Sequence, residues 1–145
     1  METINQPISS SERTLLVVPM HKKSYDTIPY PASSIRRKFP LAYSYLRGKI
    51  KRAEVNVGDI VVEDVREGKV ICWIIIHSQS ERKYSLESIE RAVERIAAAG
   101  LHQKYDMAFP ALGCYSDDGV DLIDVIGVLK QHLGDAKHLS IHTDY

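Results

Sequence analysis

The run Lys69–His77 (KVICWIIIH) constrains the possible folds more than any other stretch of the sequence. Its apolar residues do not alternate with polar ones, so a strand formed here has both faces covered. Strands of this kind occur in sheets that carry helices on each side. The run is also far too short to cross a bilayer as a helix. It therefore predicts a central strand of an α/β protein, and we expect the strands at 14–18 and 105–109 on either side of it.

Segments typical of strands and helices alternate along the rest of the chain. Apolar or β-branched runs predict further strands at 14–18 (closed by Pro19), 60–65, 105–109 and 137–142. Apolar residues at helical spacing predict helices at 35–48 (divided at Pro40 and capped by Gly48), 85–99 and 121–133. The turn at 66–68 predicts a hairpin between its two flanking strands. This order predicts an α/β fold, a three-layer α/β/α sandwich with a mixed sheet.

Composition indicates one ordinary soluble domain. The 145 residues are 44% apolar and 26% charged, which is enough to bury a core. Residues 1–13 are polar and predict a tail or an edge strand, and 14–145 predict the single domain. Nineteen basic residues balance nineteen acidic ones, so net charge does not indicate direct binding to nucleic acid or membrane.

Cysteine usage and the first residues indicate the compartment. The two cysteines show neither a CxxC pair nor a His/Cys spacing, so we expect no disulfide framework, no metal site and no cofactor. The opening METINQPISSSER lacks the apolar core of a signal peptide. We therefore expect a cytoplasmic, reduced protein.

The stretch Tyr105–Asp121 (YDMAFPALGCYSDDGVD) predicts a strand, a glycine-bearing loop and the start of a helix. In this order, backbone N–H groups converge where an anion can bind. A plain connection between a strand and a helix explains the same pattern. In open α/β sheets ligands lie beyond the carboxyl ends of strands. The loops at 20–32, 77–84 and 111–120 are therefore candidate rims of one site, and the prolines of the first predict an ordered loop over the cleft.

Three short segments carry a resemblance to a known family: RKFPLAYSY at 37–45, YSLESI at 84–89 and FPALGC at 109–114. Together they resemble the macro domain family, in particular the branch that includes antitoxin-type DNA ADP-ribosyl glycohydrolases. The segment 37–45 (RKFPLAYSY) resembles a short helix of the family that ends in Phe-Pro and is followed by tyrosines. The segment 84–89 (YSLESI) resembles the start of its long helix after the central strand. The segment 109–114 (FPALGC) resembles its Pro-x-Leu-Gly-Cys-Gly phosphate loop.

The resemblance implies a cleft that binds ADP-ribose or an ADP-ribosylated macromolecule and possesses, in part of the branch, ADP-ribosyl hydrolase activity. The ligand-binding residues it implies are Lys22, Tyr25, Ser78, Leu112, Gly113, Cys114, Tyr115, Ser116, Asp118 and Gly119. The sequence also departs from the family. The first loop contains no glycine, Tyr115 replaces a glycine, and His77–Ser78 stands where the hydrolase branch has a lysine.

Asp117 is the candidate acid–base residue, because it matches the spacing at which part of the branch has a catalytic acidic residue. A carboxylate there can activate a water at a ribose carbon. The competing interpretation is a turn at Asp117–Asp118–Gly119 with Asp121 as a helix cap. The three carboxylates also oppose a diphosphate at the helix N-terminus, which a lysine must offset.

Other side chains also have both a functional and a structural interpretation. His77 can serve as a base or a donor, or it can be a boundary residue at the end of an apolar strand. Cys114 has no base assigned to it, and Tyr115 either stacks on the ligand or covers the sheet. Two functions follow. One is binding, with or without cleavage, of an ADP-ribosyl group. The other is an inactive, degenerate macro fold that binds a macromolecular partner.

Overall fold

The computed structural model describes residues 1–21, 32–77, 86–111, 120–136 and 138–143. The elements follow in the order β1 (Glu2–Ile4), η1 (Ile8–Ser10), β2 (Leu15–His21), α1 (Ala32–Lys38), α2 (Pro40–Lys51), β3 (Ile60–Asp64), η2 (Arg66–Gly68), β4 (Val70–His77), α3 (Leu86–Ala98), α4 (Leu101–Lys104), β5 (Met107–Pro110), α5 (Leu122–Leu133) and β6 (Leu139–His142). No helix in these ranges is long and apolar enough to cross a membrane.

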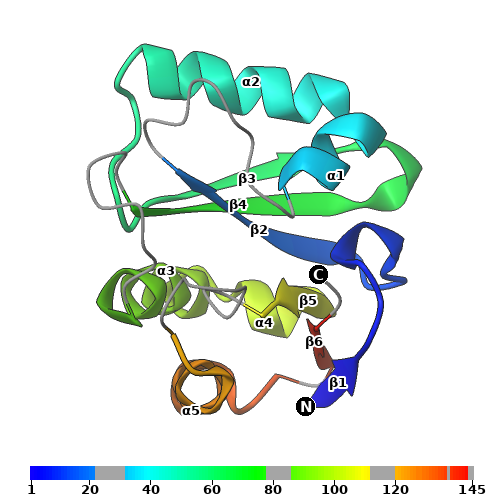
Figure 1. Cartoon of the computed structure of the whole chain (residues 1–145), viewed down its shortest axis with the longest axis vertical. Helices are drawn as coiled ribbons and strands as arrows, with labels where there is room; N and C mark the ends of the chain where they lie inside the picture. The colour runs from blue at the N-terminus through cyan, green and yellow to red at the C-terminus, as the bar shows by residue number, and fades with distance from the viewer. Residues whose placement is uncertain (22–31, 78–85, 112–119, 137, 144–145) are drawn as a thin grey trace.

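The strands form one mixed sheet in the order β1-β6-β5-β2-β4-β3. All neighbouring pairs are parallel except β3 and β4, which form the predicted antiparallel hairpin. Helices α1 and α2 cover one face of the sheet, and α3 and α5 cover the other (Figure 1). The predicted three-layer α/β/α sandwich is confirmed.

The apolar run of β4 is explained by this layering. Cys72, Ile74 and Ile76 belong to the core under α3 and α5, whereas Ile71 and Trp73 belong to the core under α1 and α2. All of these side chains are fully buried. A strand with helices on both faces needs apolar residues at every position.

The neighbours of β4 differ from the prediction. β4 lies between β2 and β3, and β2 rather than β4 pairs with β5. The hairpin requires β3 beside β4, which takes one of the two sides of β4. The crossover through α3 then places β5 beyond β2. Apolarity showed that β4 is buried, but it carries no information about which strands flank it.

Two predicted boundaries are also corrected. β2 does not close at Pro19 but continues to His21. The backbone N–H of Leu15 donates a hydrogen bond to the carbonyl of Asp106, on the side of β5. Backbone nitrogens alternate between the two sides of a strand, so the nitrogen of Pro19 faces the same side as that of Leu15. β2 pairs with β5 at Leu15 and Leu16, before Pro19 is reached, so the N–H that proline lacks interrupts no pair between these two strands. Gly48 does not end α2, because buried Ile50 continues the apolar face to Lys51.

Other boundaries agree with the sequence. Pro40 separates α1 from α2 and stands in the first turn of α2, where a missing N–H costs nothing. Gly100, with φ of 67°, follows α3 and precedes the short α4, which was not predicted. Glu2–Ile4 pairs with β6 as an edge strand.

Candidate functional site

The carboxyl ends of three adjacent parallel strands meet at one edge of the sheet. β2 ends at His21, β4 at His77 and β5 at Pro110. The sheet order places β5, β2 and β4 side by side, and both pairs are parallel. The chain therefore leaves all three strands at the same edge. This is where open α/β sheets bind ligands, so this edge is the candidate site.

The predicted loops follow these three strand ends directly in the sequence. Segment 22–31 comes after β2, 78–85 after β4, and 112–119 one residue after β5. The predicted site residues in them lie outside the described residues: Lys22, Tyr25, Ser78, Leu112, Gly113, Cys114, Tyr115, Ser116, Asp117, Asp118 and Gly119. The expected position of the 20–32 loop over the cleft lies outside them as well. The fold thus brings together the starting points of the three loops.

The ends of β2 and β4 carry an irregularity in their pairing. Met20 pairs with Ile75, but His21 pairs with His77, so Ile76 is an extra residue on β4. Such a bulge bends its strand, and bulges are common beside active sites. It places the backbone positions of two histidines opposite each other at the candidate edge.

Helix α5 begins beside the same edge, directly after the third loop. Asp121 occupies its N-cap position, and its carbonyl accepts the N–H groups of Asp124 and Val125. The predicted capping position is therefore confirmed, but the Asp121 side chain makes no capping hydrogen bond. The Asp121 side chain therefore does not occupy the N–H groups of the first turn, which are groups that can donate hydrogen bonds to an anion.

A third histidine ends a parallel strand of this sheet and was not predicted to matter. His142 closes β6 opposite Pro110. Its Nδ1 lies 3.0 Å from the carbonyl of Gln6, and its Nε2 lies 3.3 Å from Oγ of Ser140. Burial lowers the pKa of His142. The ring is therefore a neutral link between β6 and the segment after β1. In the sequence, only the spacing of Ser140 and His142, which places both on one face of a strand, could have indicated this contact.

The buried cysteine of β4 has no catalytic character. Cys72 is fully enclosed, and burial raises the pKa of its thiol to about 12. The thiolate is the reactive form of cysteine, so this side chain is not a nucleophile at neutral pH.

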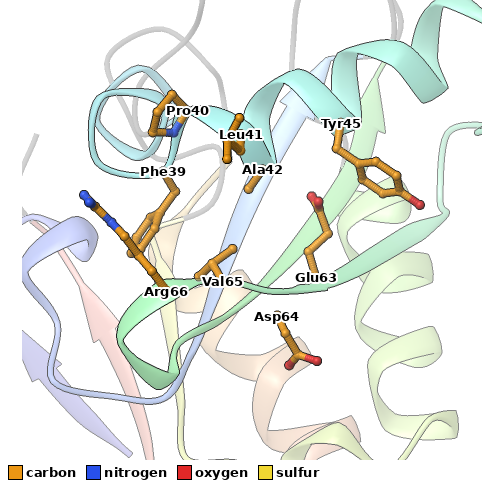
Figure 2. Close-up of a pocket in the computed structure, with 9 residues that line it drawn as sticks. All are labelled: Phe39, Pro40, Leu41, Ala42, Tyr45, Glu63, Asp64, Val65 and Arg66. Carbon is orange, nitrogen blue, oxygen red and sulfur yellow. The ribbon is translucent and has the colours of Figure 1, made fainter.

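An open groove of about 490 Å³ lies elsewhere, between the start of α2 and β3 (Figure 2). Tyr45 lines it from α2, Phe39 lines it from the position just before α2, and Glu63 points into it from β3. Nε1 of Trp73 donates a 2.6 Å hydrogen bond to Glu63. Asp64, beside Glu63, pairs with Val70, the first residue of β4. The groove is thus nearer the amino end of β4, away from the candidate edge at His77.

The fold is that of a macrodomain. The macrodomain of Thermus aquaticus DarG superimposes with a TM-score of 0.83 at 15% identity, over 98% of this chain and 97% of that one. The macrodomain of Mycobacterium tuberculosis DarG gives a TM-score of 0.83 at 18% identity, over 100% and 99%. No family model and no curated protein sequence matches the chain.

A third solved structure contains a ligand. Thermosipho africanus DarTG in complex with ADP-ribose superimposes with a TM-score of 0.77 at 17% identity, over 93% of this chain and 39% of that one. Identities this low establish a shared fold. The macro domain fold that the sequence motifs predicted is confirmed.

Proposed function

We propose that the chain binds ADP-ribose, or a related ADP-ribosyl group, at the carboxyl edge of β5, β2 and β4. One observation carries the proposal: the strand order makes the three predicted ligand loops start at a single edge. Two further findings support it. The fold is that of a macrodomain, and one similar structure has ADP-ribose bound.

The diphosphate is the part of the ligand that this edge suits best. In our proposal it lies between the glycine loop at Gly113–Gly119 and the first turn of α5. Backbone N–H groups and the helix dipole favour an anion there, and Asp121 leaves those N–H groups uncapped. Lys22 supplies a compensating charge, and Tyr25 and Tyr115 contact the nucleoside portions.

Hydrolysis of an ADP-ribosyl linkage is the finer part of the proposal. Asp117 acts as the general base toward a water at the ribose carbon. His77 donates a hydrogen bond to the ADP-ribosyl group or accepts one from it. The substrate is then an ADP-ribosylated macromolecule.

Calorimetric titration with ADP-ribose tests binding. We expect one site with a Kd below about 100 µM, and weaker binding of AMP and of ribose 5-phosphate, which each hold only part of the ligand. Heat changes that are equal for ADP-ribose and buffer contradict the proposal. Release of ADP-ribose from a modified substrate then tests hydrolysis separately.

A second function, that of a macromolecular interaction module, is favoured by the charge of one layer. Residues 32–53, which span α1 and α2, contain seven basic side chains and no acidic one: Arg36, Arg37, Lys38, Arg47, Lys49, Lys51 and Arg52. Arg36, Arg37, Lys51 and Arg52 are exposed. The net charge of zero thus conceals a basic face, which attracts an acidic macromolecule.

Binding to a single-stranded oligonucleotide at two salt concentrations separates the two functions. An interaction through the basic layer weakens steeply as salt rises, and Arg37→Ser with Lys51→Ser reduces it. The same double substitution is expected to leave ADP-ribose binding unchanged, because these residues lie on a helical layer and not at the strand ends. If a wild-type protein binds neither probe, both functions are excluded.

A further inference from the structure

Three potential metal ligands converge where α3 packs against α5. Glu90 and Glu94 lie one helical turn apart on α3, and His132 lies near the end of α5. Nε2 of His132 is 3.1 Å from Oε1 of Glu90 and 3.9 Å from Oε1 of Glu94. One donor atom from each of the three side chains lies within 4.8 Å of the others.

The basic residues on α3 are engaged elsewhere. Arg91 forms a 2.7 Å ion pair with Glu87, and Arg95 lies 3.5 Å from Asp59. Within the described parts of the chain, no lysine or arginine nitrogen lies within 4.0 Å of Glu90 or Glu94. Like charges on successive helical turns destabilise a helix. Two carboxylates therefore face one imidazole, an arrangement that suits a bound cation.

We propose that Glu90, Glu94 and His132 bind one divalent transition-metal ion of the Zn²⁺ class. One imidazole nitrogen and two carboxylate oxygens are ligands that Zn²⁺ accepts, and a water completes four-coordination. Two ligands of a tetrahedral zinc ion are about 3.3 Å apart, given bond lengths of about 2.0–2.1 Å. The pair of His132 and Glu90, at 3.1 Å, already has this separation.

Glu94 is the ligand that has to move. Its oxygen must approach Nε2 of His132 by about 0.6 Å to reach tetrahedral separation. The Glu94 side chain is 55% exposed, which leaves it room to change rotamer, whereas the His132 side chain is only 19% exposed and has less room to move. The cluster thus consists of one fixed pair and one adjustable arm.

A metal at this position joins α3 to α5. These helices form the layer on one face of the sheet (Figure 1), and each follows one of the strands that end at the candidate edge. The proposed ion stabilises the helical layer and takes no part in the binding or cleavage of ADP-ribose.

The test is a Zn²⁺ titration in competition with a chromogenic chelator, using the whole chain after treatment with a chelator and a reductant. His132→Ala is the main variant, and the matched control is His138→Ala, which removes an exposed histidine outside the cluster. We expect the wild type and the control each to bind one equivalent of Zn²⁺ with the same affinity. His132→Ala is expected to bind Zn²⁺ at least tenfold more weakly. Equal zinc affinity and stoichiometry in all three proteins overturn the proposal.

A second variant protects the test against loss of folding. Glu94→Gln changes an exposed side chain, so we expect it to fold normally and to weaken zinc binding by about tenfold. Thermal unfolding provides the second measurement. A hundredfold excess of Zn²⁺ over its Kd is expected to raise the Tm of the wild type by about 5–10 °C. A similar rise in both variants overturns the proposal.

Discussion

His21 and His77 are paired in register at the carboxyl ends of β2 and β4, on the far side of a shift that leaves Ile76 unpaired. Without the extra residue, His21 would face Ile76 and the two histidines would be out of step. The bulge therefore sets two titratable residues side by side where the proposed ligand loops begin. His77 was a predicted catalytic residue, whereas His21 was not in the predicted site.

The histidine pair gives the first prediction. If both rings contact the bound ADP-ribosyl group, His21→Ala and His77→Ala should each weaken ADP-ribose binding by about 10–100-fold, the value of a hydrogen bond to a charged group. The loss of binding free energy in the double variant should differ from the sum of the two single losses by about 0.5–3 kcal/mol, because neighbouring residues couple. Calorimetry on the four proteins measures the coupling. Affinities equal to the wild type would limit the pair to a boundary role.

Two glycines give a matched pair of opposite predictions. Gly100 has φ of 67°, so Gly100→Ala is strained and should lower the free energy of unfolding by about 1–2 kcal/mol. Gly127 lies within α5, and a Cβ there meets no atom within 4 Å. Gly127→Ala should therefore raise that free energy by about 0.5–1 kcal/mol. Urea unfolding compares them, and effects of the same sign would contradict the assigned backbone conformations.

Lys69 anchors the segment before β2, and its removal should destabilise the fold. Its ammonium donates to the carbonyl oxygens of Ser11, at 2.9 Å, and Arg13, at 2.6 Å. Lys69→Met keeps the aliphatic stem and removes both charged hydrogen bonds, so we expect a loss of about 1.5–3 kcal/mol. Lys51→Met is the control, because Lys51 is exposed on α2. Equal Tm values for the two variants would show that the anchor contributes nothing.

Glu63 should make stability fall as pH rises. Burial raises the pKa of this carboxyl above its ordinary value of 4.5, against the opposing hydrogen bond from Trp73. The folded chain then holds a proton that the unfolded chain has released, so stability decreases upward from about pH 4.5. Glu63→Gln removes the titration and keeps an oxygen for Trp73. Its Tm advantage over the wild type should grow between about pH 4 and pH 7, and a shrinking advantage would mean that the charged hydrogen bond outweighs burial.

The order of strands and helices could be predicted because each element follows its own local pattern. The unbroken apolar run of β4 predicted a strand covered on both faces, and the spacing of Ile89, Val93 and Ile96 predicted α3. Which strands flank β4 depends on the hairpin with β3 and on the crossover through α3, and these are properties of the whole chain. The proposed metal site could not be predicted from the sequence for the same reason, since only the packing of α3 on α5 brings His132 to Glu90.

The sequence predicted where in the fold the candidate site lies, but not how its side chains are arranged. The motif around Gly113 and the rule for strand ends pointed to the edge that the fold provides. The glycine-free loop that follows His21 carries no pattern from which side-chain positions could be deduced. The His21–His77 pairing depends on a one-residue bulge, which neither strand's apolar pattern reveals.

The last prediction concerns Asp117, the proposed acid–base residue, whose carboxylate was chosen for its spacing from Gly113–Cys114. If it activates water, Asp117→Ala should lower turnover of an ADP-ribosylated substrate by about 10²–10⁴-fold, the usual contribution of a general base. Binding of ADP-ribose should persist or tighten, because a carboxylate near a diphosphate is repulsive. The competing interpretation makes Asp117 a turn residue, whose loss costs about 0.5–2 kcal/mol of stability and leaves any activity intact.

Asp121→Ala is the matched control for that experiment. Asp121 is an exposed aspartate that occupies the cap position of α5 without a side-chain capping bond, so its removal should leave Tm nearly unchanged. Its carboxylate lies near the proposed diphosphate, so we expect its removal to affect the binding of ADP-ribose and not the rate of the chemical step. Release of ADP-ribose is measured together with a melting curve for each protein. A large loss of turnover in Asp117→Ala, with normal melting and intact control activity, supports the catalytic role. Normal turnover with a lowered Tm would assign Asp117 to the turn, because a general base cannot be removed without slowing the step that it serves.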